Sequence, residues 1–270
     1  MKLQRGKVES VRRWKAQRGF SLVEMAVVLV IIGLILGAVM IGRDAQRNAE
    51  YVKIRQTFVN QWAVAYNTYV QRTGAPVGDD LQAPTLIVNG QDYRDRAQPT
   101  GGDLSNAKEP PMICHGGKPP ETLRDADGKP ERDLRTLMLQ AGVELPQGRG
   151  QGQEDRYVYR DTNGNPQELQ VCFQWNKPGT ASGSGNVMVI AGLTPDLARS
   201  LASAINGNAS NNTGSFRQEG ATTGALVDTG KGLSQGTDWG ATNTDNYVGA
   251  SATNREAQVR TVVAHYKMNQ

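Results

Sequence analysis

Two hydrophobic patterns follow one another near the start of the chain. Residues 20–42 form an apolar run with a single ionisable side chain, Glu24. At about 1.5 Å per residue this run gives a helix about 34 Å long, enough to cross the hydrocarbon of a bilayer. Residues 43–73 then place apolar residues at mixed spacings of three and four, interrupted at Arg55, which is typical of an amphipathic helix.

The amphipathic stretch is expected to end at Gly74 and Pro76, which are helix-stopping residues. We therefore predict one continuous helix over residues 20–73, about 80 Å long, whose second half lies on a folded domain. The aromatic residues of that half are interpreted as core packing rather than as a cofactor site. They stand at positions 58, 62, 66 and 69.

Strand-like alternation begins after residue 156. Residues 157–160 and 169–175 alternate apolar and polar positions around turn chemistry at 161–164, which predicts a β-hairpin. Residues 187–191 and 259–268 are further strand candidates. Short helices are expected over 132–141 and over 195–205, the latter capped by Thr194. The predicted class is α+β: a long N-terminal helix packed on an antiparallel β-sheet head.

The chain divides by composition into a basic leader (1–19), a transmembrane half-helix (20–42), an amphipathic half-helix (43–73) and a loop-rich head (74–270). Many glycine and proline pairs make 74–156 an irregular connection, apart from the short helix. Residues 206–256 are rich in Gly, Asn, Ser and Thr and are expected to form surface loops. Those loops are a binding face, a glycan-bearing surface with N-x-S/T sequons at Asn208 and Asn211, or solvated filler.

The positive charge of the chain is concentrated in its leader. The formal net charge is +4, and residues 1–19 alone carry +6, so the rest of the chain is slightly acidic. A nucleic-acid-binding domain would carry its positive charge in the body of the protein, so no nucleic-acid partner is predicted. The basic flank is expected to stay in the cytoplasm and the head to be exported.

Glu24 is the residue that decides among the possible kinds of membrane segment. A carboxylate within a membrane span is costly unless something compensates its charge. Cleavage between Gly19 and Phe20 would create an α-amino group four residues away, which could pair with Glu24 of the same or a neighbouring chain. The alternative is a glutamate that reaches the interface from a plain signal anchor.

Residues 18–25, Arg-Gly-Phe-Ser-Leu-Val-Glu-Met, resemble the processing site of type IV prepilins and of type II secretion pseudopilins. The resemblance implies cleavage after Gly19, N-methylation of Phe20 and a role for Glu24 in assembly. It also implies a pilin-like α+β fold. Gly33 and Gly37 form a GxxxG pattern that allows close helix packing in a membrane. Many pilins have a proline late in this span, whereas this chain has Ile41 and Gly42.

Two further stretches resemble a subgroup of large prepilin-type proteins more loosely. Residues 66–80 are similar to a segment that ends in Pro-Gly-Asp-Asp, here with Val77 inserted before Gly78. Residues 192–217 are similar to a segment in which an acidic position, here Asn206, precedes Thr-Gly-Ser. These matches indicate lineage rather than activity.

Cys114 and Cys172 are the only cysteines of the chain. An exported domain meets an oxidising compartment, so a disulfide between them is the favoured interpretation. It would close a loop of about 59 residues and stabilise the fold by about 4 kcal/mol in the chain-entropy model. The alternative is a free catalytic Cys114 beside His115.

Candidate metal and catalytic residues are few. Asp125, Asp127 and Asp133 form a weak calcium candidate, because the spacing lacks an acidic residue that an EF-hand loop requires. His115 and His265 are isolated, and no common catalytic motif is present. No cofactor and no enzymatic activity are predicted.

The sequence therefore predicts a structural subunit, major or minor, of a type IV pilus-like filament. The partners that the resemblance implies are a prepilin peptidase, other pilins, an inner-membrane assembly platform and an assembly ATPase. The precursor would span the cytoplasmic membrane once, and the assembled protein would lie in an extracellular pilus or a periplasmic pseudopilus. The alternatives are a type II secretion pseudopilin and a membrane-anchored periplasmic binding protein that does not polymerise.

Overall fold

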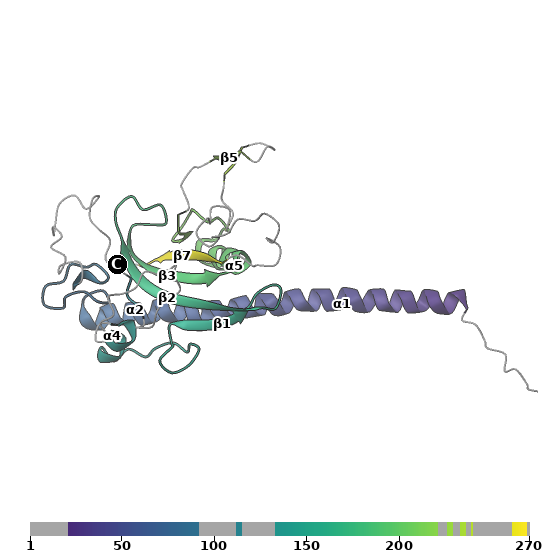
Figure 1. Ribbon diagram of the computed structural model, residues 1–270, viewed down its shortest axis with the longest axis horizontal. Helices are drawn as coiled ribbons and strands as arrows, with labels where there is room; N and C mark the ends of the chain where they lie inside the picture. Colours follow the sequence, from purple (N-terminus) through teal and green to yellow (C-terminus); the bar gives the residue numbers. More distant parts are fainter. Residues whose placement is uncertain are drawn as a thin grey trace, which may run out of the picture. The chain divides into compact units, whose positions relative to one another are not determined.

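The computed structural model describes residues 21–91, 112–114, 133–220, 226–228, 233–235, 239 and 261–268. It divides into two compact units after Arg47. The first unit contains the N-terminal part of the long helix. The second, Asn48–Gln270, contains the rest of that helix and the head, whose elements are labelled in Figure 1.

The long N-terminal helix is continuous from Leu22 to Thr73. It consists of α1 (Leu22–Ile54), a five-residue π-helical turn η1 (Arg55–Val59) and α2 (Asn60–Thr73). Gly74 ends it in a left-handed conformation (φ 77°) and donates its N–H to Val70 O at 2.8 Å. A side-chain-bearing residue would be strained there. The predicted helix end is confirmed.

The π turn explains why the apolar stripe is interrupted at Arg55. A π turn holds more residues than an α turn, so it rotates the face that follows. Tyr51 and Ile54 are buried before it, and Phe58 and Val59 are both buried at its end. The buried face then continues along α2 to Val70. The turn thus keeps the helix against the core on both of its sides.

The head is built on a five-stranded antiparallel sheet in the order β1-β2-β3-β7-β4. Strands β1, β2, β3 and β7 are labelled in Figure 1. The strands are β1 (Arg156–Arg160), β2 (Pro166–Asn176), β3 (Gly185–Leu193), β4 (Phe216–Gln218) and β7 (Val262–Lys267). A separate pair is formed by β5 (Leu226–Asp228) and β6 (Leu233–Gln235). The predicted α+β class and the hairpin of β1 and β2 are confirmed.

One face of the sheet packs on the helix. Phe173 of β2 stacks on Tyr66 of α2, with ring centroids 4.9 Å apart, and tilts against Trp62 at 6.2 Å. All three side chains are fully or almost fully buried. The aromatic residues of the amphipathic half are therefore core residues, as their spacing predicted.

The opposite face of the sheet carries a second, smaller apolar cluster. It consists of Met112, Cys114, Cys172, Val187, Val189 and Ala191. Cys114 and Cys172 are joined in a disulfide, with their Cα atoms 4.9 Å apart. Ile113 pairs with Phe173 through two backbone hydrogen bonds. The disulfide thus fastens residues 112–114 along β2.

Two short helices flank the sheet. α4 (Leu134–Gln140) begins at Asp133, whose side chain accepts Thr136 N–H at 2.6 Å. α5 (Pro195–Asn206) begins at Thr194, whose hydroxyl accepts Leu197 N–H. Both were predicted. The expectation that residues 206–256 are only surface loops is wrong for β4, which is paired with β7 and buries Phe216.

Candidate functional site

The start of α1 is closed by two side chains. Ser21 N–H donates to Glu24 Oε2 at 2.8 Å, and Glu24 N–H donates to Ser21 Oγ at 3.2 Å. This reciprocal pair is a capping box, which satisfies backbone donors that the first helical turn leaves without partners. Glu24 is thereby held at the N-terminal end of the helix, where the helix dipole favours negative charge. Gly19 and Phe20 lie outside the described residues.

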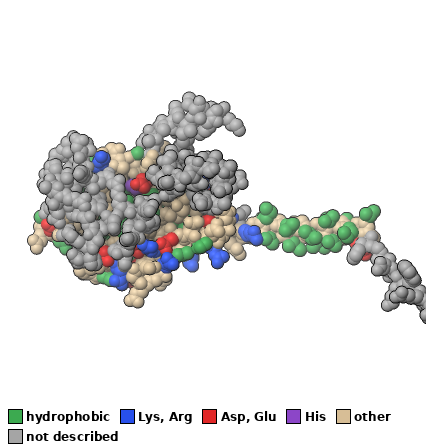
Figure 2. All heavy atoms as spheres, viewed as in Figure 1, with side chains coloured by type: hydrophobic (Ala, Val, Ile, Leu, Met, Phe, Trp, Pro, Cys, Tyr) green, Lys and Arg blue, Asp and Glu red, His purple; other side chains and the backbone are tan. Residues whose placement is uncertain are grey.

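The following turns of α1 expose an uninterrupted apolar surface. Its large hydrophobic side chains, from Leu22 to Ile41, are between 46% and 91% exposed. Figure 2 shows these side chains in green along the helix. Among the described residues, one helix is long and apolar enough to cross a membrane, with a mean hydropathy of 2.9 in its most apolar window. So large an apolar surface requires lipid or other helices around it.

Gly33 and Gly37 lie one above the other on α1, because they are four residues apart. A Cβ atom built at either position would meet no atom within 4 Å. The backbone is therefore accessible here, and a second helix could approach it closely. Nothing in the described part of the chain occupies that surface.

A family model described as the prokaryotic N-terminal methylation motif matches residues 14–40. The chain carries a prepilin-type N-terminal motif. The match covers the end of the leader, the Gly19–Phe20 junction, Ser21, Glu24 and both glycines of the GxxxG pattern, and it stops before the head. Searches of curated proteins and of solved structures gave no significant match. The motif and the apolar helix fit a membrane-anchored precursor.

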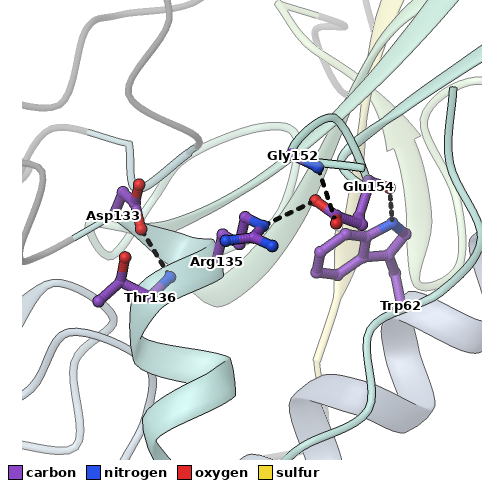
Figure 3. A network of polar contacts seen from close by, with 6 residues as sticks. All are labelled: Trp62, Asp133, Arg135, Thr136, Gly152 and Glu154. Atoms are coloured by element: carbon purple, nitrogen blue, oxygen red, sulfur yellow. Dashed lines mark hydrogen bonds and ion pairs between the residues drawn. The ribbon is translucent and has the colours of Figure 1, made fainter. Parts of the chain in front are cut away.

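Within the head, Glu154 connects α2, α4 and the loop before β1 (Figure 3). Its backbone carbonyl accepts Trp62 Nε1–H at 3.3 Å. Its carboxylate accepts Gly152 N–H at 2.9 Å and pairs with Arg135 Nε at 3.1 Å. Burial alone would raise the pKa of Glu154, but the Gly152 N–H and the Arg135 guanidinium lower it overall. These contacts indicate that Glu154 holds α2, α4 and the loop before β1 together, rather than acting as a catalytic carboxylate.

Asp79 fixes the conformation of the chain around residues 76–80, which resemble the Pro-Gly-Asp-Asp segment. Its buried carboxylate accepts Thr85 N–H, Thr85 Oγ–H and Leu86 N–H, at 2.7–2.8 Å. Gly90 lies so close that a Cβ atom there would collide with Asp79 Oδ1 and Thr85 Oγ1. The segment therefore folds the chain back after the long helix, which is a structural role.

Asn206, at the end of α5, fixes the conformation of the Thr-Gly-Ser segment at residues 213–215. Its Oδ1 accepts the backbone N–H groups of Ser215 and Phe216 at 2.9 and 3.1 Å. Its Nδ2 donates to Thr213 O and Phe216 O at 2.9 and 2.7 Å. An acidic residue in this position could accept but could not donate. Asn206 thus positions β4 through both halves of its amide.

The calcium candidate is divided between described and undescribed parts of the chain. Asp133 is the N-cap of α4, whereas Asp125 and Asp127 lie outside the described residues. No group of three or more His, Cys, Asp or Glu side chains that could hold a metal occurs among the described residues. The calcium site stays a prediction. His115 also lies outside the described residues.

His265 in β7 belongs to a buried polar cluster that the sequence did not indicate. Its Nδ1 lies 2.9 Å from Asn176 Nδ2 and 2.8 Å from Ser182 Oγ. Nδ1 therefore accepts, and the proton of the neutral ring is on Nε2. Burial lowers the pKa of His265 to about 4, so the ring is neutral at pH 7. His265 is 89 and 83 residues from Asn176 and Ser182, so the cluster gives no local signal.

Proposed function

We propose that this protein is the precursor of a structural subunit of a type IV pilus-like filament. One observation carries the proposal: a prepilin-type motif lies directly at the start of an apolar helix whose large side chains are all exposed. Lipid covers such a surface in the precursor, and neighbouring helices cover it in a filament. A prepilin peptidase would cut after Gly19 and methylate the new amine of Phe20.

The capping box gives Glu24 a defined role before cleavage. Its carboxylate is engaged with Ser21 N–H, so the precursor enters the membrane with part of its hydrogen-bonding capacity satisfied. Cleavage then creates a positive amine at Phe20. This amine, on the same or an adjacent subunit, pairs with Glu24, because each charge lowers the free energy needed to bury the other. The pairing sets the axial register between subunits.

Helix packing provides the remaining cohesion of the filament. The glycine face of Gly33 and Gly37 allows one α1 to approach another at short distance. The partners are other pilins, the peptidase, an inner-membrane assembly platform and an assembly ATPase. The head leaves the membrane with the growing filament. A type II secretion pseudopilin would share every one of these steps, and the location of the polymer distinguishes the two.

The test compares Glu24→Gln with Glu50→Gln in the native host. Both changes remove one carboxylate from α1, but only Glu24 lies within the motif. We expect Glu24→Gln to reduce filaments at least about tenfold while the processed subunit remains in the membrane, and Glu50→Gln to assemble normally. Filaments recovered by shearing cells identify a pilus, and polymers confined to the periplasm identify a pseudopilus. Normal assembly of Glu24→Gln would contradict the proposed mechanism.

A further inference from the structure

A small pocket lies on the head where the turn between β2 and β3 meets β4 and the end of β7. Its volume is about 230 Å³. Its lining consists of residues 179–184, Gly214, Ser215, Arg217 and Lys267. The pocket belongs to the Asn48–Gln270 unit and is separate from the helix and the motif described above. Its walls are thus glycines, alanine, hydroxyl side chains and two cations.

The charge of this pocket is positive and is not balanced by an acidic side chain. Among the described residues, no Asp or Glu contributes to the lining. In the described part of the chain, neither Arg217 nor Lys267 forms an ion pair with a carboxylate. Because a cleft lined by one sign of charge attracts ions of the opposite sign, these two cations indicate an affinity for anions.

The sheet register places the two cations side by side. Arg217 of β4 is the register partner of His265 of β7, and Lys267 is two residues beyond His265 on the same strand. Residues two apart on a strand, and residues directly opposite on neighbouring strands, point to the same face. Arg217 and Lys267 therefore share the face on which His265 lies.

Arg217 is fixed in place before any ligand arrives. Its Nε donates to Gly214 O at 2.8 Å, and its Nη1 donates to Ala181 O at 3.3 Å. Both carbonyls belong to the pocket wall. A guanidinium has five N–H groups, so others remain for a ligand. A cation that is already oriented loses little conformational entropy on binding.

Ser182 connects the wall of the pocket to a buried polar cluster. Ser182, which is buried and lines the pocket, donates to His265 Nδ1, and Asn176 Nδ2 donates to the same atom. His265 Nε2 is buried and has no partner among the described residues. The cluster fixes Ser182 and the turn that carries it, since Asn176 Nδ2 also donates to Gly183 O at 2.8 Å, so this wall of the pocket keeps its shape without a ligand.

We propose that this pocket binds one oxyanion, namely a carboxylate or phosphate group carried by a ligand. Its volume is below the roughly 300–1,000 Å³ of pockets that enclose whole small molecules, so the site holds one charged group of a ligand. Arg217 and Lys267 provide charge-assisted hydrogen bonds, which are the strong ones for such groups. The site does not depend on cleavage at Gly19, so its test is independent of filament assembly.

The test is calorimetric titration of the full-length protein in a neutral detergent, with inorganic phosphate and, separately, glucuronate. Chloride at the same ionic strength is the reference. We expect saturable binding of at least one probe, weakened about tenfold or more by Lys267→Gln. Arg160→Gln is the matched control, because it removes one cation from β1 at the other edge of the sheet. It should leave binding unchanged.

Lys267→Gln is the deciding variant because Arg217 also holds the pocket wall together. Loss of binding in Arg217→Gln supports the oxyanion site only if this variant keeps the circular dichroism spectrum and the unfolding midpoint of the wild type. Binding of phosphate alone assigns a phosphate group, and binding of glucuronate assigns a sugar carboxylate; either supports the site. Absence of saturable binding by both probes, or equal binding by Lys267→Gln and the wild type, would overturn it.

Discussion

Ser21 and Glu24 each donate a backbone N–H to the side chain of the other, at 2.8 and 3.2 Å, and so close the first turn of α1. This pair connects the processing motif to the fold of the membrane helix. The glutamate on which assembly is proposed to depend is also a residue that caps the first turn of the helix. When cleavage forms the Phe20 amine, the Glu24 carboxylate must therefore either leave Ser21 N–H for this amine or accept hydrogen bonds from both groups.

Removal of the Ser21 hydroxyl should loosen the start of the helix. Ser21→Ala deletes the acceptor of Glu24 N–H, and loss of such a cap costs about 1 kcal/mol of local stability. We expect amide hydrogen exchange at Glu24 to become about fivefold faster in detergent micelles. Ser21→Thr keeps a hydroxyl and should exchange at the wild-type rate. Equal protection in Ser21→Ala would show that the hydroxyl does not cap the helix.

Asp79 should be far more important for stability than its neighbour Asp80. Asp79→Ala leaves Thr85 N–H and Leu86 N–H without their acceptor in a partly buried loop, at a cost of about 2–4 kcal/mol. Asp80 is half-buried and accepts Gln82 N–H in an exposed turn, so Asp80→Ala should cost less than Asp79→Ala. Urea unfolding of both variants measures the difference. Similar midpoints would contradict the structural role of Asp79.

The disulfide should account for a large part of the stability of the head. Replacing Cys114 and Cys172 together by alanine removes a link between residues 58 positions apart. The expected loss is about 4 kcal/mol of unfolding free energy in the chain-entropy model. Chemical denaturation of the double variant, with and without reductant, measures it. If the stability of the wild type were unchanged by full reduction, the bridge would not support the fold.

His265 should make the head sensitive to acid. Its folded-state pKa of about 4 lies below the ordinary value of 6.5, because the charged ring would be buried. The neutral ring therefore contributes its full share of the unfolding free energy above pH 6.5. That contribution is lost as the pH falls toward 4, because the unfolded chain binds a proton that the folded chain does not, and the loss is about 3 kcal/mol.

The comparison between the wild type and His265→Gln isolates this contribution. The glutamine variant should unfold with a free energy that falls less steeply between pH 7 and 4, because it lacks the titrating ring. Parallel pH profiles of the two proteins would show that His265 does not titrate in the way its burial implies.

The sequence predicts those parts of the fold whose signals are local. The hairpin of β1 and β2 was predictable because apolar and polar residues alternate on both sides of a turn with Asp161 and Gly164. The end of the long helix was predictable from Gly74. The N-terminal motif was equally accessible, because its glycine, its glutamate and the apolar run lie within one short stretch.

Features that depend on distant residues were not predictable. β4 has three residues, too few to show alternation, and it exists because Phe216 pairs with Tyr266 of β7. The cluster of His265 joins residues 83 and 89 positions apart. The π turn at Arg55–Val59 changes the helix phase without a proline or glycine to mark it. The partnership of Ser21 with Glu24 has a spacing of three residues and could have been found as a capping box.

Processing after Gly19 is the step that turns the proposed precursor into a filament subunit. Mass spectrometry of the mature N-terminus, on protein isolated from the native host, detects it. We expect a chain that begins with N-methylated Phe20 in the wild type, and a chain that retains residues 1–19 when Gly19 is replaced by Glu. A wild-type protein that keeps its leader in the host membrane, with Phe20 unmodified, would show that the chain is not a filament-subunit precursor.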